Sequence, residues 1–429
     1  MTVSPSAFPP VGVHDIAVHL PRYSLEMSAL LQARVAADPG IERHLLRAVA
    51  STGQQAMRWP TPTEDTITMA AEAFRQLLVR PNTPDLSKVR FLTLGTETSV
   101  DMSKSGSAYV QGLMQRSGFP VPISLSSYQV QHACAGGALA MMTTASFLQV
   151  AGRTDESAVV LMSDVARYQA PSTAEVTQGA GAAALWVTQN PDLLEFDFLT
   201  AGFASRDVDD FFRPLGSTIA KVKGGFSLAC YHESLADAFA DHCQRAGVDP
   251  AEELRSVDVF CLHAPYARMP VVAMERLLAT HLGLDAEAAN VFLEERGFSA
   301  GLIPTSQVGN LYTGSLWLNL AASLAERAKV FGPSLVGKKV LLASYGSGNT
   351  MTVFTGRLAA KAPQVIARWN LDAQLANKEE PGLDTYQFWI DTHRTPENFP
   401  EILANYPPRA GQFALTGLRA DGYREYQLV

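Results

Sequence analysis

Short apolar runs alternate with longer segments of helical periodicity along the first half of the chain. A few consecutive apolar residues are typical of a buried strand, whereas apolar residues at every third or fourth position indicate an amphipathic helix. The pattern predicts strands over 14–20, 89–94 and 158–161. It predicts helices over 66–79, 105–114 and 136–150.

A comparable order returns after about residue 200. Strands are predicted over 257–262, 339–343 and 351–355, and helices over 233–246, 270–282 and 311–327. The alternation favours an α/β fold with largely buried strands, and the repeated order predicts two related halves that meet face to face. The polar, aperiodic stretch 376–382 predicts a surface loop before a final segment, 411–429.

Composition narrows the class of protein. The 429 residues are 47% hydrophobic, so the chain can bury a large core, and its length alone suggests two or three domain-sized units. The net charge is -8 and the basic residues are scattered, which argues against a nucleic-acid partner. The N-terminal segment MTVSPSAFPPVGVHDIAVHL lacks the features of a signal peptide, and no run of about 18 apolar residues is found. We expect a cytoplasmic protein without a membrane partner.

Four cysteines, Cys134, Cys230, Cys243 and Cys261, are too few and too irregularly spaced for a disulfide framework. The sequence has no CxxC pair with the spacing of metal ligands. A cysteine with a special role is therefore expected to be a nucleophile.

Cys134 lies in the segment QHACAGGALA, where a polar turn gives way to a long helix of small residues. A helix N-terminus lowers a thiol pKa through its macrodipole and free N–H groups, which predicts a thiolate nucleophile. The two following glycines allow a thioester to come close. The alternative is a small buried hydrophobic residue, which is what most free cysteines are.

Two further polar residues follow strand-like runs. His263 comes directly after 257–262 and before Pro265, and the carboxyl ends of strands in open α/β sheets gather catalytic groups; a satisfied structural histidine is the alternative. Cys261, two residues before His263, should point to the same side of the strand but deeper, into the core. Glu97 follows 89–94, and burial could raise its pKa so that it serves as acid and base. Its alternative role is a capping or surface carboxylate near the helix that carries Lys104.

Two glycine-bearing turns complete the candidate site, VGNLYTGS over 308–315 and ASYGSGN over 343–349. The second contains GxG, but a strand pattern follows it, whereas a dinucleotide-binding loop needs GxGxxG at the start of a helix. A nicotinamide or flavin site is therefore rejected. Asn310 could donate its amide to a substrate carbonyl, alongside backbone N–H groups between Ser344 and Gly348, or it could be only a helix cap.

Together these segments resemble the 3-hydroxy-3-methylglutaryl-CoA synthase family of the thiolase superfamily, from about Val13 to Tyr426. Five motifs occur in family order: ThrGluThr around Glu97, AlaCys around Cys134, the HisAlaPro of His263, ValGlyAsnLeuTyrThrGlySer, and SerTyrGlySerGly. Further matches are SerAspValAlaArgTyr from Ser163, ThrGlnGlyAlaGlyAla from Thr177, AspPhePheArgPro from Asp210, and ArgGluTyr from Arg424. The ordered set makes the resemblance specific.

The resemblance implies that Cys134 accepts an acetyl group, Glu97 removes a proton from its methyl carbon, and His263 orients the β-keto thioester that this carbon attacks. The substrate-binding positions it implies are Asn310, Ser344, Tyr345, Gly346, Ala135, Tyr168 and Phe212. It also implies a five-layered αβαβα fold of two pseudo-repeated halves, 1–195 with Glu97 and Cys134, and 196–429 with His263 and Asn310. A homodimer and no metal or redox cofactor are expected, with acyl-CoA or an acyl-phosphopantetheine carrier protein as substrate.

One departure concerns the residue after the nucleophile, which is usually tyrosine in the family and is Ala135 here; Ala174, Glu175 and Val176 likewise replace GlyGluPro. Loss of the ring should open space for one more methylene, so that propionyl as well as acetyl is accepted. Leu125, Tyr168 or Phe212 could instead refill the space.

Three alternatives follow from these residues. The carrier could be CoA, or an acyl carrier protein as in polyketide β-branching, and Ala135 favours a specialised biosynthetic enzyme. CysAlaGlyGly also resembles the β-ketoacyl-carrier-protein synthase III branch, which performs no aldol step. That branch uses Cys, His and Asn without an acidic residue, so the presence of Glu97 argues against this alternative. A catalytically silent partner subunit is the third reading, and the intact Cys, Glu and His set argues against it.

Overall fold

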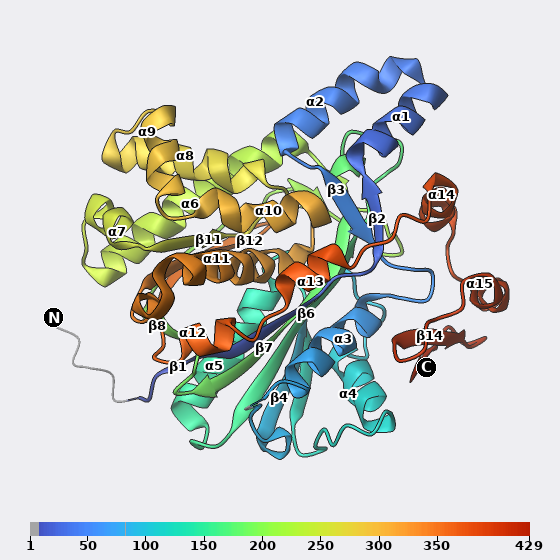
Figure 1. Ribbon diagram of the computed structural model, residues 1–429, viewed down its shortest axis with the longest axis horizontal. Helices are drawn as coiled ribbons and strands as arrows, with labels where there is room; N and C mark the ends of the chain where they lie inside the picture. The colour runs from blue at the N-terminus through green and yellow to red at the C-terminus, as the bar shows by residue number, and fades with distance from the viewer. Residues whose placement is uncertain (1–7, 82) are drawn as a thin grey trace.

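A nine-stranded sheet runs through the part of the chain that the computed structural model describes, residues 8–81 and 83–429 (Figure 1). Residues 1–7 of the N-terminal segment considered above lie outside it. The strands follow the order β11-β12-β13-β8-β1-β7-β6-β4-β5. Their bounds are β1 (Val11–His19), β4 (Val89–Gly95), β5 (Ser126–Val130), β6 (Ser157–Ala166), β7 (Gly179–Gln189), β8 (Leu194–Ser205), β11 (Val259–Leu262), β12 (Lys339–Gly346) and β13 (Thr350–Leu358).

The two halves of this sheet repeat one pairing scheme. β1 pairs antiparallel with β7, β7 antiparallel with β6, and β6 parallel with β4. β8 pairs antiparallel with β13, β13 antiparallel with β12, and β12 parallel with β11. The halves join where β1 pairs with β8 at only two positions, Gly12 with Glu195 and Val13 with Leu194. The predicted mixed α/β fold is confirmed, and each predicted strand falls on an observed one.

Two helices lie in the central core between the halves, α5 (Gly136–Ala151) and α11 (Ser315–Phe331). Buried residues of both helices belong to one cluster with side chains of β1, β6, β7, β11, β12 and β13. The stretch Ala133–Ala151 has a mean hydropathy of 1.3, long and apolar enough to cross a membrane by length and composition, although no such run was expected. Half of this stretch is buried, and the buried side of α5 forms part of the central core.

Two outer cores cover the other faces of the halves. The helices α3 (Thr66–Leu78) and α4 (Gly106–Arg116) pack on β4, β6 and β7. The helices α6 (Gly224–Ala246) and α8 (Arg268–Leu282) pack on β11, β12 and β13 (Figure 1). All were predicted, but α6 starts at Gly224 rather than at 233, because its first turns are largely exposed and show no apolar period.

The remaining strands and α-helices, with the 3-10 turn at the site, are β2 (Tyr23–Glu26), α1 (Met27–Ala37), α2 (Glu42–Thr52), β3 (Ala56–Trp59), β9 (Phe211–Phe212), β10 (Lys221–Val222), α7 (Pro250–Ser256), α9 (Ala286–Glu294), α10 (Phe298–Val308), the 3-10 turn η4 (Tyr312–Gly314), α12 (Ala362–Ile366), α13 (Leu371–Ala376), α14 (Leu383–Asp391), α15 (Phe399–Asn405), β14 (Phe413–Leu418) and β15 (Arg424–Leu428). Of these elements, β2, α1, α2, β3 and α14 form a hydrophobic cluster of their own beside the central and outer cores. The predicted loop 376–382 is a loop over 377–382, because Ala376 is the last residue of α13. The final segment forms a hairpin of β14 and β15, which was not predicted. The hairpin and α15 pack against the core of α3 and α4, so the end of the chain returns to the first half.

Candidate active site

Cys134 lies in the turn that joins β5 to α5. The preceding Ala133 has φ +42°, a left-handed conformation that is uncommon for a residue with a side chain. The Ala135 N–H donates to the His132 carbonyl at 3.0 Å, which closes the turn. The half-buried Cys134 side chain packs against an aromatic cluster that contains Tyr168, Phe211 and Tyr312. The turn thus holds the thiol against aromatic rings at the start of the central helix.

The thiol pKa differs from the sequence prediction. Burial raises the pKa of Cys134 well above its usual value, and the negative charges of Glu97, Asp164 and Asp210 raise it further, while Arg213 opposes the rise. The predicted lowering by the helix N-terminus is therefore wrong, because burial of the thiol, and secondly the charges of three carboxylates from distant segments, raise its pKa. All four cysteines are free, and the raised pKa favours the protonated form of the Cys134 thiol.

Glu97 follows β4, and its side chain is 7% exposed. Burial, with a contribution from Asp164, raises the pKa of its carboxyl to about 7, and the Arg213 guanidinium opposes this rise. Arg213 Nη2 lies 3.4 Å from Glu97 Oε1. The residue that caps α4 is Ser105, so Glu97 does not cap that helix. A carboxyl with a pKa near neutrality can both take and return a proton.

Asp164 of β6 holds the Glu97 loop in place. One carboxylate oxygen accepts from Thr96 Oγ1 (2.9 Å), Glu97 N (2.8 Å), Thr98 N (3.0 Å) and Thr98 Oγ1 (2.7 Å). The other accepts from the N–H and hydroxyl of Thr313 at 3.0 and 2.5 Å. Sequence reasoning assigned Asp164 no role, although a charged residue within the apolar strand around it was a visible signal.

His263 directly follows the last residue of β11, as predicted. Its N–H donates to the Ala343 carbonyl of β12 at 2.8 Å, and its carbonyl accepts from the Tyr231 hydroxyl at 3.0 Å. Burial lowers the pKa of the imidazole to about 3, so the ring is neutral. Cys261 is fully buried in the central core, as predicted. His263 is thus fixed by its backbone at the end of a strand.

Asn310 lies just before η4. Its Oδ1 accepts from Tyr312 N at 2.8 Å and from Ser315 Oγ at 3.2 Å. Its Nδ2 is 3.5 Å from the Tyr168 hydroxyl, in the aromatic cluster beside Cys134. Burial raises the pKa of Tyr168 to about 12, so this hydroxyl remains a donor.

Ser344, Tyr345 and Gly346 lie within β12 rather than in the predicted turn. The antiparallel ladder pairs Ser344 with Thr352 and Tyr345 with Met351. The Tyr345 hydroxyl donates to Asp210 Oδ2 at 2.9 Å, and Gly348 N donates to Asp210 Oδ1 at 2.9 Å. We expected the Gly348 N–H to face a substrate carbonyl, but it donates to Asp210. The sequence could not predict this contact, because Asp210 lies in a loop far away along the chain.

Gly346 meets the Cys134 turn. A Cβ placed on it would lie 2.5 Å from the His132 carbonyl oxygen and 2.7 Å from the Ala135 Cβ. Ala135 is 2% exposed. The end of β12 can approach the nucleophile this closely only because position 346 has no side chain.

Phe212 lies at the rim of the site with 45% of its surface exposed, whereas its neighbour Phe211 is buried. The Phe211 ring is 5.7 Å from Tyr312 and 6.5 Å from Tyr168. Leu125 packs in the core of α3 and α4 and not in this cluster. Of the three residues considered for refilling the space beside Ala135, only Tyr168 belongs to the aromatic cluster, and the sequence did not single out Phe211.

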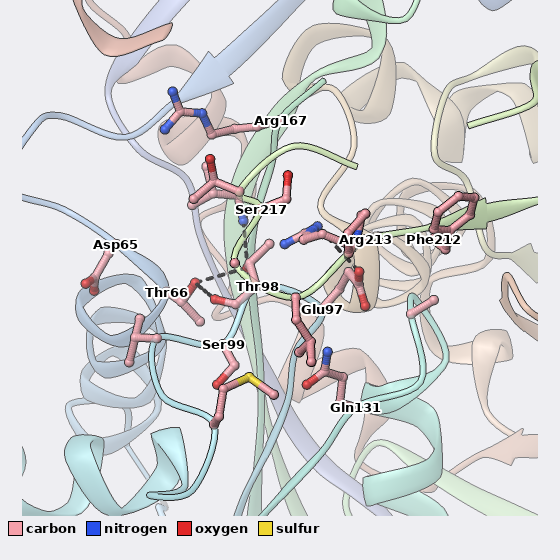
Figure 2. Close-up of a pocket in the computed structure, with 18 of the residues that line it drawn as sticks. Asp65, Thr66, Glu97, Thr98, Ser99, Gln131, Arg167, Phe212, Arg213 and Ser217 are labelled. Atoms are coloured by element: carbon pink, nitrogen blue, oxygen red, sulfur yellow. Dashed lines mark hydrogen bonds and ion pairs between the residues drawn. The ribbon is translucent and has the colours of Figure 1, made fainter. Parts of the chain in front are cut away.

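A cavity of about 610 Å³ opens onto this region (Figure 2). Of the residues that the structure describes, its lining includes Glu97, His132, Ala133, Phe212 and Arg213. Cys134, His263 and Asn310 are not part of the lining, although Ala133 directly precedes the thiol. A volume of this size suits a small-molecule substrate, and its wall carries the Glu97 carboxyl.

Both halves of the chain match one protein family. The hydroxymethylglutaryl-coenzyme A synthase N-terminal family matches residues 10–192, and the corresponding C-terminal family matches residues 286–409. The hydroxymethylglutaryl-CoA synthase of Enterococcus faecalis is 30% identical over 88% of this chain and 90% of its own length. The synthase of Haloferax volcanii is 26% identical over 88% and 91%.

Solved structures of hydroxymethylglutaryl synthases are similar to this chain over nearly its whole length. MvaS in complex with 3-hydroxy-3-methylglutaryl coenzyme A has a TM-score of 0.83 and 31% identity, and covers 98% of this chain and 99% of its own. The HMG synthase of the curacin biosynthetic pathway in complex with holo donor-ACP has a TM-score of 0.82 at 22% identity, covering 98% and 100%, which shows a shared fold.

Proposed function

Because the chain belongs to the hydroxymethylglutaryl-coenzyme A synthase family, its reaction is a condensation of that type, and we propose that it joins a Cys134-bound acetyl group to a β-ketoacyl thioester. The product is a 3-hydroxy-3-methylglutaryl-type thioester. The observation that carries the proposal is the pairing of a half-buried thiol with a carboxyl whose pKa is about 7, close enough that the charge of Glu97 raises the thiol pKa.

The first step is transfer of the acetyl group to sulfur. The Cys134 thiol gives up its proton, its sulfur attacks the thioester carbonyl of the donor, and the carrier thiolate leaves and takes up a proton. The transfer of the acetyl group therefore takes up and releases no net proton. Because burial and carboxylates raise the pKa of Cys134, acylation should become faster as the pH rises.

The second step forms the carbon–carbon bond. Glu97 removes a proton from the acetyl methyl group, and the resulting carbanion attacks the ketone carbon of the acceptor. The neutral His263 ring orients the acceptor, and the alkoxide that forms takes a proton. Hydrolysis then breaks the carbon–sulfur bond at Cys134. Splitting the reaction through a covalent intermediate lowers each barrier.

The other positions are assigned to substrate binding. Asn310 and Tyr168 bind the acyl end beside Cys134, which their contact within the aromatic cluster supports. Ser344, Gly346 and Ala135 form the wall behind the thiol, and Tyr345 holds Asp210 in that wall. Phe212 contacts the substrate at the rim of the cavity.

The donor carrier is a phosphopantetheine thiol, either of CoA or of an acyl carrier protein. The MvaS structure contains a CoA thioester, and the curacin enzyme was solved with an acyl carrier protein. Acetyl is the proposed acyl group, with propionyl as a second donor because Ala135 is small. Ala135 also supports a specialised role such as polyketide β-branching.

Offering acetyl-CoA and an acetyl-carrier protein separately, followed by mass spectrometry of the Cys134 peptide, tests this function. The correct carrier adds one acetyl group, and subsequent addition of an acetoacetyl thioester gives a tertiary alcohol. Acylation without a tertiary alcohol would instead indicate a synthase III-like acyltransferase. No acylation from either donor would indicate a silent subunit and refute the proposal.

For the assembly, we propose a five-layered αβαβα arrangement in a cytoplasmic homodimer. The repeated strand order and the three cores support the layers. The proposed halves are 1–195 and 196–429, whose boundary falls within β8. A relative from Homo sapiens is named as cytoplasmic, which supports the location.

A further inference from the structure

Arg213 extends into the cavity from the loop after β9, toward Glu97 (Figure 2). Its side chain is 13% exposed, and its guanidinium carbon lies 5.9 Å from the centre of the Tyr312 ring. Within residues 8–81 and 83–429, its Nε and Nη2 atoms are both buried and have no hydrogen-bond partner. The 3.4 Å separation from Glu97 is longer than the 2.7–2.9 Å typical of a charge-assisted hydrogen bond.

The charge of Arg213 acts on Glu97, on Cys134 and on two tyrosines of the aromatic cluster. It opposes the raised pKa of Glu97, of Cys134, of Tyr168 and of Tyr312. The charges that raise the pKa of Cys134 belong to three carboxylates. An anion formed at the acyl carbon on Cys134 would be repelled by them, so a favourable site for it depends on Arg213.

Buried donors without a partner are rare in folded proteins, because each loses its hydrogen bonds to water. Arginine presents its N–H groups as a planar fork that fits the two oxygens of a carboxylate. Among the described residues, Arg213 Nε has no hydrogen-bond partner and Nη2 has only the 3.4 Å ion pair with Glu97. These two donors therefore indicate a ligand with a carboxylate rather than a neutral acyl chain.

We propose that Arg213 binds the carboxylate that appears on the product when the acyl group leaves Cys134. This inference rests on the proposed function. Water adds to the carbonyl carbon of the Cys134 thioester, a carbon–oxygen bond forms and the carbon–sulfur bond breaks. The sulfur leaves with the electron pair and takes one proton of the water, and the acid releases the other. The product then carries a carboxylate at one end, held by Arg213, and the carrier thioester at the other.

The role of Arg213 is that of a specificity-determining residue. It favours a ligand with a free acid over the same ligand without the charge. The ligand class is a thioester of a dicarboxylic acid, and the free acid is the end that lies against Glu97. No such preference is expected from Phe212, the neighbouring lining residue, which offers only an apolar ring.

The test compares two pantetheine thioesters, 3-hydroxy-3-methylglutaryl pantetheine and its methyl ester, by calorimetry on the full chain. The natural protein should bind the acid at least about tenfold more tightly than the ester. Arg213→Gln should bind both equally, and Arg213→Lys should keep part of the preference because it retains the charge without the fork. The matched control Arg206→Gln, which removes an exposed arginine paired with Asp237, should behave as the natural protein.

Equal binding of acid and ester by the natural protein would overturn the proposal without any variant. A preserved preference in folded Arg213→Gln, checked by circular dichroism, would also overturn it. The acylation experiment on Cys134 is independent: absence of acylation refutes the proposed function, whereas acylation and condensation without an acid preference refute only the role of Arg213.

Discussion

Replacing Gly346 by alanine should disable Cys134 without touching it. The new Cβ would lie 2.5 Å from the His132 carbonyl oxygen, 2.7 Å from the Ala135 Cβ and 2.9 Å from the Ala135 nitrogen. Two of these three atoms belong to the backbone of the nucleophile turn. The conflict therefore cannot be relieved by rotating a flexible side chain.

The size of the effect follows from these distances. Carbon atoms in contact prefer about 3.5–4.0 Å, so the turn or the end of β12 must move by about 1 Å. Overpacking of this kind costs about 1–3 kcal/mol of stability. A displacement of about 1 Å at a reacting atom can lower a rate about 100-fold. We therefore expect Gly346→Ala to fold, to unfold at a lower temperature, and to acylate Cys134 about 100 times more slowly.

The assay is a time course of acetyl incorporation into the Cys134 peptide by mass spectrometry, with a thermal unfolding curve for each protein. Gly225→Ala is the matched control, because a Cβ there meets nothing within 4 Å in the first turn of α6. It should acylate at the natural rate and be slightly more stable. Natural acylation and an unchanged unfolding temperature in Gly346→Ala would refute the argument that β12 positions the nucleophile turn.

Four further predictions concern other residues. Cys134→Ser should abolish acylation and condensation, because a hydroxyl stays protonated where a thiolate must form; normal turnover would contradict the covalent scheme. Glu97→Gln should keep the rate of acylation but lower the rate of condensation about 100- to 10,000-fold. In the natural enzyme, the condensation rate should rise as the pH passes about 7, where Glu97 loses its proton. A condensation rate that does not change with pH would exclude Glu97 as the base. The natural enzyme should be acylated by both acetyl and propionyl thioesters, whereas Ala135→Tyr should favour acetyl by about 1–3 kcal/mol in activation free energy. Equal rejection of propionyl by both proteins would show that other side chains refill the pocket. Glu175→Ala should destabilise the fold by about 3–5 kcal/mol in chemical unfolding, because it leaves the Arg34 guanidinium without the buried carboxylate 2.6 Å away; a change below about 1 kcal/mol would show that water compensates.

Local patterns in the sequence carried much of the fold. The strands β4 and β11 were predicted from runs of large apolar residues, and their ends placed Glu97 and His263 after buried strands. The strand β7 was not predicted, because GAGAAALWVTQ is mostly glycine and alanine and has few of the branched residues that mark a strand. Its small side chains instead let α3 and the central helices come close on both faces.

The electrostatics of the site needed the tertiary structure. The residues around Cys134 alone predicted a lowered pKa, and that direction was wrong. Burial raises the pKa most, and the charges that raise it further lie on Glu97, Asp164 and Asp210, which belong to three separate segments of the chain. Charge acts through space and not along the sequence, so its effect could be worked out only once the fold had brought these carboxylates around the thiol.

The sequence by itself determined the alternation of strands and helices, the positions of the strand ends, and the ordered motifs that identify the family. The tertiary structure decided how deeply each neighbour in a motif is buried, as with the buried Phe211 and the exposed Phe212, and which charged groups lie close together, as with Arg213 and Glu97. The physical reason is one of range. Periodicity and backbone preference act between residues a few positions apart, whereas desolvation and charge depend on atoms that only folding brings together.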